Sequence, residues 1–502
     1  VITTNDTILT AYLHTGKRYV FDIIQIHTDD TASAVFQEIR TRYLKNKTVT
    51  KNNVGKITDD VLSFFENHGY PYATLYFDSV KENGNKISAL LKINKGELVT
   101  IDSVIIYGQV KISKAYLYNK LGIFPGDLYN ESQISEISKN IDDVNFLQEA
   151  KKHLIKYKKD KVVIELFLKE RKASKFSGIA GFMPDVNTGK TLITGDVNLN
   201  IINALGRGER FYFQWRRITE NSQNLVVNAT YPYLLNSKLG LNSGLSIYKR
   251  DTLFNNTNLK LGLDYLFSNK FIVTGFYEME QSAVLSSISE ETLDNLERLP
   301  YVTSYYGFDI QWIKTDYLYN PLKGFAGRLT TSAGQKKFTD HPQIPRGFTD
   351  SLNQQNLQFK THIDWNLYVP TGKQSTIKFR INSGTVYGSK LVLNEIFRIG
   401  GLNTLRGFNE ESLFASTFAI GTLEWRYIFE KNAAAYLFFD GAYYEKNINS
   451  GYFKDFPYGF GAGVNFETKA GIFNLAYALG SEQNNPIEIR NAKIHFGFVN
   501  FF

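Results

Sequence analysis

The sequence predicts two small α+β modules followed by a closed antiparallel transmembrane β-barrel of about 16 strands. Three observations carry this prediction. The chain ends on an aromatic strand, helical periodicity stops near residue 171, and the remaining residues form an even number of strand-like segments. We expect the modules over residues 1–98 and 99–172, and the barrel over residues 173–502.

The end of the chain is an alternating strand, Asn491-Ala-Lys-Ile-His-Phe-Gly-Phe-Val-Asn-Phe-Phe502. Side chains on a strand alternate between two faces, and one face here carries Ile494, Phe496, Phe498 and Phe502. An unpaired strand with such a face invites edge-to-edge aggregation in water. Closing the sheet into a barrel removes the edge, and lipid makes the aromatic face favourable.

The composition favours strands over helical cores. Aromatic residues make up 15% of the 502 residues, with 31 Tyr and 38 Phe, whereas Met numbers only 2. Such residues are enriched in strands and in the aromatic girdles of membrane barrels. A soluble all-β sandwich or adhesin would explain the composition equally well. There is no run of about 18 apolar residues, so we expect no transmembrane helix.

Other features narrow the class of protein. Cysteine is absent, which excludes thiol catalysis, disulfide bonds and thiolate metal sites. The histidines lack ligand spacing, and we find no nucleophile elbow or dinucleotide motif, so we expect no catalytic residue, metal or cofactor. The charge of +8 fits contact with anionic lipid, and equally plain solubility. No signal-peptide pattern is present, so we expect Val1 to begin a processed chain.

The first part of the chain contains one module twice. The order is strand, helix, helix, strand, strand, over a strand from Tyr19, helices at Thr31–Tyr43 and Val54–Asn67, and strands at Tyr72–Val80 and Lys86–Ile93. The same order recurs over Ile101–Tyr107, Lys114–Leu121, Glu131–Asp143, Ala150–Lys158 and Val162–Lys169. Each unit is roughly 80 residues long, so an internal repeat is the better interpretation.

From Lys175 onward the alternation predicts the barrel strands. We expect them at Phe176–Met183, Thr191–Ile202, Glu209–Arg217, Asn224–Tyr233, Lys238–Tyr248, Thr257–Phe267, Lys270–Gln281, Tyr301–Thr315, Gly324–Lys336, Asn356–Val369, Ser375–Tyr387, Ser412–Phe429, Ala433–Glu445, Tyr458–Thr468, Gly471–Leu479 and Arg490–Phe502. The two longest connections, Ser282–Pro300 and Lys337–Gln355, should be extracellular.

Two stretches carry a family resemblance. Val104-Ile-Ile-Tyr-Gly-Gln-Val-Lys-Ile-Ser-Lys, with Leu121-Gly-Ile-Phe-Pro-Gly-Asp-Leu-Tyr-Asn, resembles a POTRA domain, the periplasmic module that precedes Omp85-family barrels. Asn67-His-Gly-Tyr-Pro-Tyr-Ala is similar to the corresponding stretch of another POTRA domain. A generic α/β adaptor is the alternative for these modules.

The most specific motif is Ile399-Gly-Gly-Leu-Asn-Thr-Leu-Arg-Gly-Phe-Asn-Glu-Glu. It resembles the Omp85 loop that folds into the barrel lumen, which we place at residues 391–412, and Arg406, Gly407 and Phe408 match its Arg-Gly-Phe tip. Gly407 would allow a sharp turn, and Phe408 would anchor the loop to the inner wall.

An arginine in the lumen needs acidic partners, because its desolvation is otherwise uncompensated. Glu424 and Asp440 match the family's acidic wall positions, and an arginine can fork two carboxylates. We therefore predict that Arg406 contacts Asp440 or Glu424. The alternative is that Arg406 is a solvated loop residue and Asp440 an isolated inward charge.

The resemblance implies a bacterial outer-membrane protein, with its N-terminal domains in the periplasm, that inserts or translocates client proteins without covalent chemistry. The first and last strands would meet at a seam that opens to a client strand, with Gly178 and Gly181 loosening the first strand. On the last strand, the seam residues would be Phe496, Phe498 and Phe502. Expected partners are outer-membrane lipids, unfolded β-barrel or secreted clients and other assembly subunits, and no nucleic acid.

Two alternatives remain open. The chain has room for only about two POTRA modules, which suits a two-partner-secretion pore for one dedicated exoprotein. The amino-terminal plug helix expected of such a pore is not evident in Val1–Lys17. An accessory scaffold barrel within a larger outer-membrane complex is the other alternative.

Overall fold

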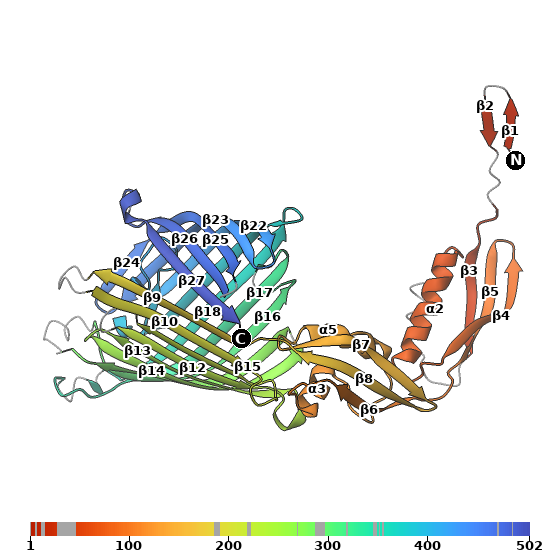
Figure 1. The fold of residues 1–502 in the computed structure, drawn as a ribbon, viewed down its shortest axis with the longest axis horizontal. Helices are drawn as coiled ribbons and strands as arrows, with labels where there is room; N and C mark the ends of the chain where they lie inside the picture. The colour runs from red at the N-terminus through yellow and green to blue at the C-terminus, as the bar shows by residue number, and fades with distance from the viewer. Residues whose placement is uncertain are drawn as a thin grey trace. The chain divides into compact units, whose positions relative to one another are not determined.

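The computed structural model describes residues 2–5, 8–11, 16–27, 47–184, 191–217, 222–268, 270–286, 297–317, 320–344, 349–350, 352–353, 356–468, 471–483 and 485–501. The chain divides into two compact units (Figure 1). One contains Val1–Val110 and Lys120–Lys169, and the other contains Lys111–Asn119 and Glu170–Phe502. Across these described ranges, no helix combines the length and apolarity needed to cross a membrane.

The first module of the smaller unit is a three-stranded sheet with a helix packed on it. Its elements are β3 (Val20–His27), α2 (Lys51–Glu66), β4 (Thr74–Asn83) and β5 (Lys86–Asn94), and the sheet order is β3-β5-β4. Ile57, Val61 and Phe65, at helical spacing, bury one face of α2 in the core. The helix predicted at Thr31–Tyr43 lies outside the described residues. Before the module, β1 (Ile2–Asn5) and β2 (Ile8–Ala11) pair as a hairpin.

The second module repeats this topology with the sheet order β6-β8-β7. Its elements are β6 (Thr100–Tyr107), α4 (Glu131–Ser135), α5 (Ile137–Asp142), β7 (Leu147–Lys158) and β8 (Lys161–Glu170). Between β6 and α4 the chain forms α3 (Lys114–Leu121), most of which belongs to the larger unit. The single helix predicted at Glu131–Asp143 is therefore wrong, because the helix divides at Glu136. Backbone bonds join the modules: the Gly69 N–H donates to the Tyr129 carbonyl (3.0 Å), and the Val99 N–H donates to the Gly69 carbonyl (2.8 Å).

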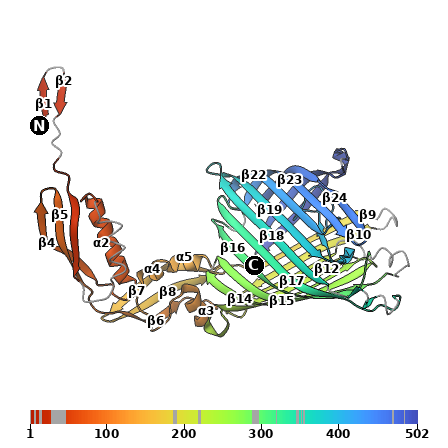
Figure 2. The same ribbon diagram turned by 180° about the vertical axis from the view of Figure 1, so that it is seen from behind.

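The larger unit is an antiparallel sheet that closes on itself (Figures 1 and 2). β24 and β25 both pair with β23 and are separated only by Phe456 and Pro457. They therefore act as one interrupted strand of the barrel. The described wall strands are β9 (Lys175–Pro184), β10 (Thr191–Ile202), β11 (Arg210–Arg217), β12 (Gln223–Tyr231), β13 (Leu239–Arg250), β14 (Phe254–Ser268), β15 (Phe271–Val284), β16 (Tyr301–Thr315), β17 (Gly324–Phe338), β18 (Leu357–Pro370), β19 (Ser375–Gly388), β22 (Thr417–Glu430), β23 (Ala433–Ile448), β24 (Gly451–Asp455), β25 (Tyr458–Thr468), β26 (Gly471–Ser481) and β27 (Lys493–Phe501).

Two predicted strands need correction. The strand predicted at Ser412–Phe429 divides at Ser416, because β21 (Leu413–Ala415) leaves the wall and pairs with β20 (Phe397–Ile399). Ala415 and Ser416 are both buried, so the buried positions shift from odd to even residue numbers at the break. The last strand begins at Lys493, after a 3₁₀ turn, instead of at Arg490.

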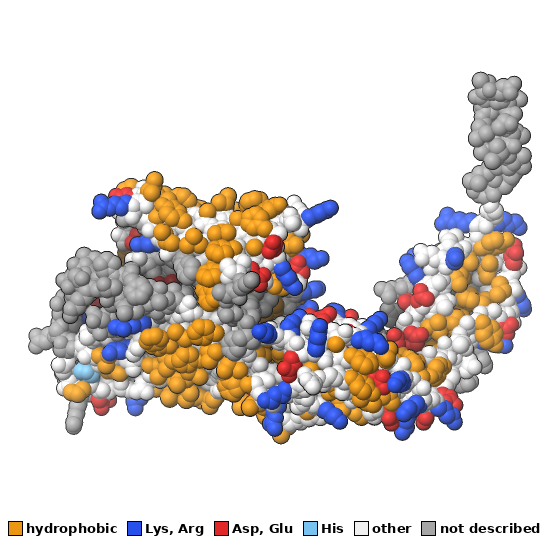
Figure 3. Space-filling model, viewed as in Figure 1, with side chains coloured by type: hydrophobic (Ala, Val, Ile, Leu, Met, Phe, Trp, Pro, Cys, Tyr) orange, Lys and Arg blue, Asp and Glu red, His pale blue; other side chains and the backbone are white. Residues whose placement is uncertain are grey.

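The outer face of the wall is apolar. On β14 the exposed side chains alternate as Leu259, Leu261 and Leu263, while the residues between them face inward. Figure 3 shows hydrophobic side chains gathered over the outer surface of the barrel. Exposed apolar surface on this scale marks contact with lipid or a partner.

The closing contact of the barrel is short. Among the described residues, β27 pairs with β9 at Asn500 with Phe176 and at Phe501 with Lys175, whereas the β9–β10 ladder has ten pairs. The predicted seam glycines pair within the wall, Gly178 with Val197 and Gly181 with Thr194. The backbones of Phe496 and Phe498 likewise pair with β26. Phe502 lies outside the described residues.

Candidate luminal site

The chain between β19 and β22, residues 389–416, forms the luminal loop, which includes the expected residues 391–412. Its two arms pair as β20 and β21, and its apolar side chains pack on the inner wall. Phe408 is buried with Phe418 and Ile420 of β22 and Tyr444 of β23. The loop therefore has the inward course and the Phe408 anchor expected from its motif.

Arg406, Glu424 and Asp440 come together as a tip cluster. The Arg406 side chain donates from Nε and Nη2 to the two oxygens of Asp440 (both 2.7 Å) and from Nη1 to Glu424 (2.6 Å). Its backbone N–H also donates to Asp440 (3.2 Å). The guanidinium carbon lies 3.5 Å from the centroid of the Phe438 ring. This is the forked geometry that arginine, and not lysine, provides.

The tip cluster is almost entirely buried. Arg406 is 8% exposed, Glu424 1% and Asp440 0%. Burial alone lowers the pKa of Arg406, but its hydrogen bonds to Asp440 and the charges of both carboxylates outweigh burial and raise that pKa. Thr422 donates a further hydrogen bond to Asp440 (2.8 Å), and Arg426 donates to Glu424. Every charge in the cluster therefore has a partner.

Glycines let the loop tip touch the wall backbone. Gly407 has φ +95°, a left-handed conformation that favours glycine. A Cβ at Gly459 of β25 would lie 2.0 Å from the Arg406 carbonyl oxygen, and one at Gly480 of β26 would lie 2.9 Å from the Gly407 carbonyl oxygen. Any side chain at Gly459 would therefore push the tip away from the wall.

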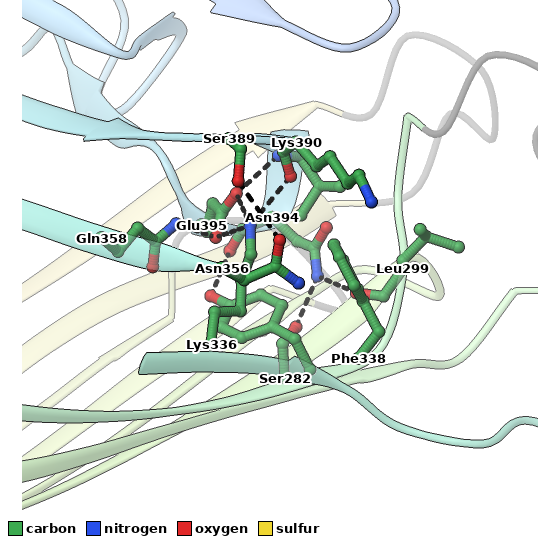
Figure 4. A network of polar contacts seen from close by, with 12 residues as sticks. Ser282, Leu299, Lys336, Phe338, Asn356, Gln358, Ser389, Lys390, Asn394 and Glu395 are labelled. Atoms are coloured by element: carbon green, nitrogen blue, oxygen red, sulfur yellow. Dashed lines mark hydrogen bonds and ion pairs between the residues drawn. The ribbon is translucent and has the colours of Figure 1, made fainter. Parts of the chain in front are cut away.

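A second polar network holds the stem of the loop, residues Ser389–Ile396 (Figure 4). The Lys336 ammonium on β17 donates to both oxygens of Glu395 (2.8 and 3.1 Å), and Gln358 on β18 donates to the same carboxylate (2.8 Å). Asn394 donates to Ser282 of β15 (2.7 Å). Burial raises the pKa of Glu395, so the pair depends on this complete set of hydrogen bonds.

A polar cavity of about 210 Å³ lies beside the tip. It is lined by wall cations, among them Lys378, Arg380 and Arg426, and by Glu424. Within the described residues, His, Asp and Glu side chains form no group of three that could hold a metal ion.

Sequence reasoning found the tip and missed the stem. Its motif and its acidic wall positions identify Arg406, Glu424 and Asp440. No sequence motif marks Lys336 or Glu395, and the two residues lie 59 positions apart, so the sequence does not predict their contact. Gly480 was also missed, since its role depends on a backbone contact between distant segments.

An apolar outer wall around an anchored luminal loop is the architecture of an outer-membrane β-barrel protein. The Omp85 superfamily domain matches residues 203–502, which is 300 of the 502 residues. The chain belongs to the Omp85 superfamily of outer-membrane proteins.

Three solved structures share this fold at low sequence identity. BamA from Haemophilus ducreyi lacking POTRA domains 1–3 has 14% identity and a TM-score of 0.51, over 96% of this chain and 99% of that one. CdiB from Acinetobacter baumannii has 14% identity and a TM-score of 0.60, over 100% of this chain and 94% of that one. CdiB from Escherichia coli has 12% identity and a TM-score of 0.64, over 99% of this chain and 93% of that one. No curated protein sequence matches the chain significantly.

Arg406→Ala should lower the free energy of unfolding by about 3–5 kcal/mol, because it leaves two buried carboxylates without their shared partner. Arg406→Lys should have a smaller effect in the same direction, since one ammonium cannot reproduce the fork. Urea unfolding in detergent micelles, followed by tryptophan fluorescence, measures both. Arg328→Ala is the control, because Arg328 is 56% exposed and its buried partner Asp309 keeps the hydrogen bond from Thr330, so the loss should be smaller, about 1 kcal/mol. Equal losses for Arg406→Ala and Arg328→Ala would contradict a stabilising tip cluster.

Gly459→Ala should displace the loop tip, because the added Cβ would overlap the Arg406 carbonyl. Hydrogen exchange of the amides at residues 400–411, measured by mass spectrometry, should become faster. Gly421→Ala is the matched control on β22, where the nearest atom to an added Cβ is 3.9 Å away. Unchanged exchange in Gly459→Ala would mean that the tip does not depend on this close contact.

Proposed function

We propose that this protein acts on other proteins at the bacterial outer membrane, inserting β-barrel clients or moving clients across, by opening the seam between β9 and β27. The observation that carries the proposal is the short ladder at the seam, which has two pairs among the described residues, against ten pairs between β9 and β10. Few hydrogen bonds need to break for the two edges to separate. Backbone groups exposed in lipid must find partners, and a client strand supplies them by adding to the open edge.

The remaining parts of the chain fit this function. Lipids cover the apolar wall, and the two α/β modules stand in the periplasm, where they meet unfolded β-barrel or secreted clients before the barrel does. The mechanism uses binding and local distortion of the membrane, so it requires no catalytic residue or cofactor. Other assembly subunits are further partners in this proposal.

A disulfide across the seam should abolish client assembly. The chain has no cysteine of its own, so Phe176→Cys with Asn500→Cys introduces one pair at positions that face each other across the seam. Assembly of a radiolabelled outer-membrane protein by the purified protein in liposomes should stop on oxidation and return on reduction, because the edges cannot part while linked.

The control pair is Phe473→Cys with Phe498→Cys, which joins β26 to β27 inside the wall at rings 4.7 Å apart. Its oxidation should leave assembly unchanged. Full assembly by the oxidised seam variant would contradict the proposal. An unmodified protein that assembles no client alone, but co-purifies with an assembly machine, would favour the accessory scaffold.

A secretion pore is the second candidate, and the observation that favours it is the luminal loop itself. The loop lies in the lumen and is held there by side-chain contacts at its tip and stem. Such a loop can act as a gate for one dedicated exoprotein, which the α/β modules would capture in extended form. The seam would then stay closed during transport.

Deleting residues 400–411 should raise the single-channel conductance in planar bilayers if the loop is the gate, because the tip is then removed from the lumen. Arg328→Ala, which alters the wall and leaves the loop in place, should conduct like the unmodified protein. Conductance that does not change after the deletion would count against the pore.

A further inference from the structure

The returning arm of the luminal loop has an ionic contact of its own, on the opposite side of the seam from the tip. Arg216 of β11 donates from Nη1 to Glu410 (3.1 Å), and the same nitrogen lies 3.6 Å from Glu411. Arg216 also donates from Nε to Asp196 of β10 (3.3 Å). Thus Glu410 is tied to the first strands of the barrel.

Cation–π contacts hold the two arms on the same side of the lumen. The Arg398 guanidinium of β20 lies 3.7 Å from the ring centroid of Tyr248 on β13. The Arg250 guanidinium of β13 lies 4.5 Å from the ring centroid of Phe414 on β21. Such contacts are attractive when the cation sits over the ring face, so both arms are fixed to β13.

The positions of these anchors around the barrel are informative. The tip touches β22 and β23 through its ion pairs and β25 and β26 through Gly459 and Gly480. The returning arm touches β11 and β13. In the circular strand order, β27, β9 and β10 are the strands between β26 and β11. The luminal loop therefore has anchors on both sides of the seam.

We propose that Arg216 and Glu410 are positioning residues that make the luminal loop a brace, joining the two sides of the seam from inside the barrel. Among the described residues the seam ladder has two pairs, so contacts that bypass the ladder add to the closure of the seam. Arg216 and Glu410 hold the first strands, and the tip cluster holds the last ones.

The two ends of the brace differ in strength. Tip-cluster side chains are 9% exposed at most, whereas the side chains of Arg216 and Glu410 are 18% and 32% exposed. Water competes for the Arg216–Glu410 pair, and exposed pairs contribute little individually. The brace is therefore fixed at the tip and releasable at Arg216.

The test measures seam closure directly, as the rate of disulfide formation between Phe176→Cys and Asn500→Cys in the full-length protein in liposomes. Arg216→Gln and Glu410→Gln should each slow this rate by about two- to fivefold, the range expected for loss of one partly exposed ion pair. The double variant should be no slower than Arg216→Gln, because both substitutions remove the same contact. Arg328→Gln, which breaks the luminal pair with Asp309, should leave the rate unchanged.

Unchanged rates in Arg216→Gln and Glu410→Gln, or additive slowing in the double variant, would overturn the brace. A structural defect is distinguished by a second variant, Arg216→Cys with Glu410→Cys. Its disulfide replaces the ion pair, so it should reduce hydrogen exchange in β9 and β27 relative to the reduced form, and equal exchange would also overturn the brace. Neither readout involves a client, so failure here leaves the proposed function standing.

Discussion

The position of the luminal loop depends on how the positive charge of the buried Arg406 guanidinium is compensated. Arg406 is buried against the wall, and a guanidinium there is tolerated only when carboxylates and hydrogen bonds replace its water. Asp440 and Glu424 supply both, on adjacent strands. Since Asp440 also accepts from the Arg406 backbone, the charge and the chain path of the tip are fixed by one carboxylate.

The wall accommodates this tip by omitting side chains. Gly459 and Gly480 face the backbone of residues 406 and 407 at distances that no Cβ would permit. The stem is fixed differently, by the Lys336–Glu395 pair and its amide neighbours at the ends of other strands. Tip and stem together place a folded segment across the lumen, where a polar interior would otherwise admit water.

Much of the architecture follows from local patterns. Alternation along the strands separates an apolar outer face from an inner one, and it places the wall strands to within a few residues. The repeated order of strands and helices indicates two similar modules. Arg406, Glu424 and Asp440 were identified differently, from the resemblance of the loop motif and of two acidic wall positions to the Omp85 family.

The sequence by itself determined the class of fold and the approximate positions of the wall strands, because both depend on neighbours along the chain, and the resemblance of its loop motif to the Omp85 family pointed to the tip cluster. Only the tertiary structure decided that β21 leaves the wall at Ser416, that Glu395 meets Lys336, and that Glu410 reaches Arg216. Arg216 and Glu410 are 194 positions apart in the sequence. Contacts of this kind depend on how the closed sheet brings distant strands to face one lumen, and spacing along the chain carries no record of that.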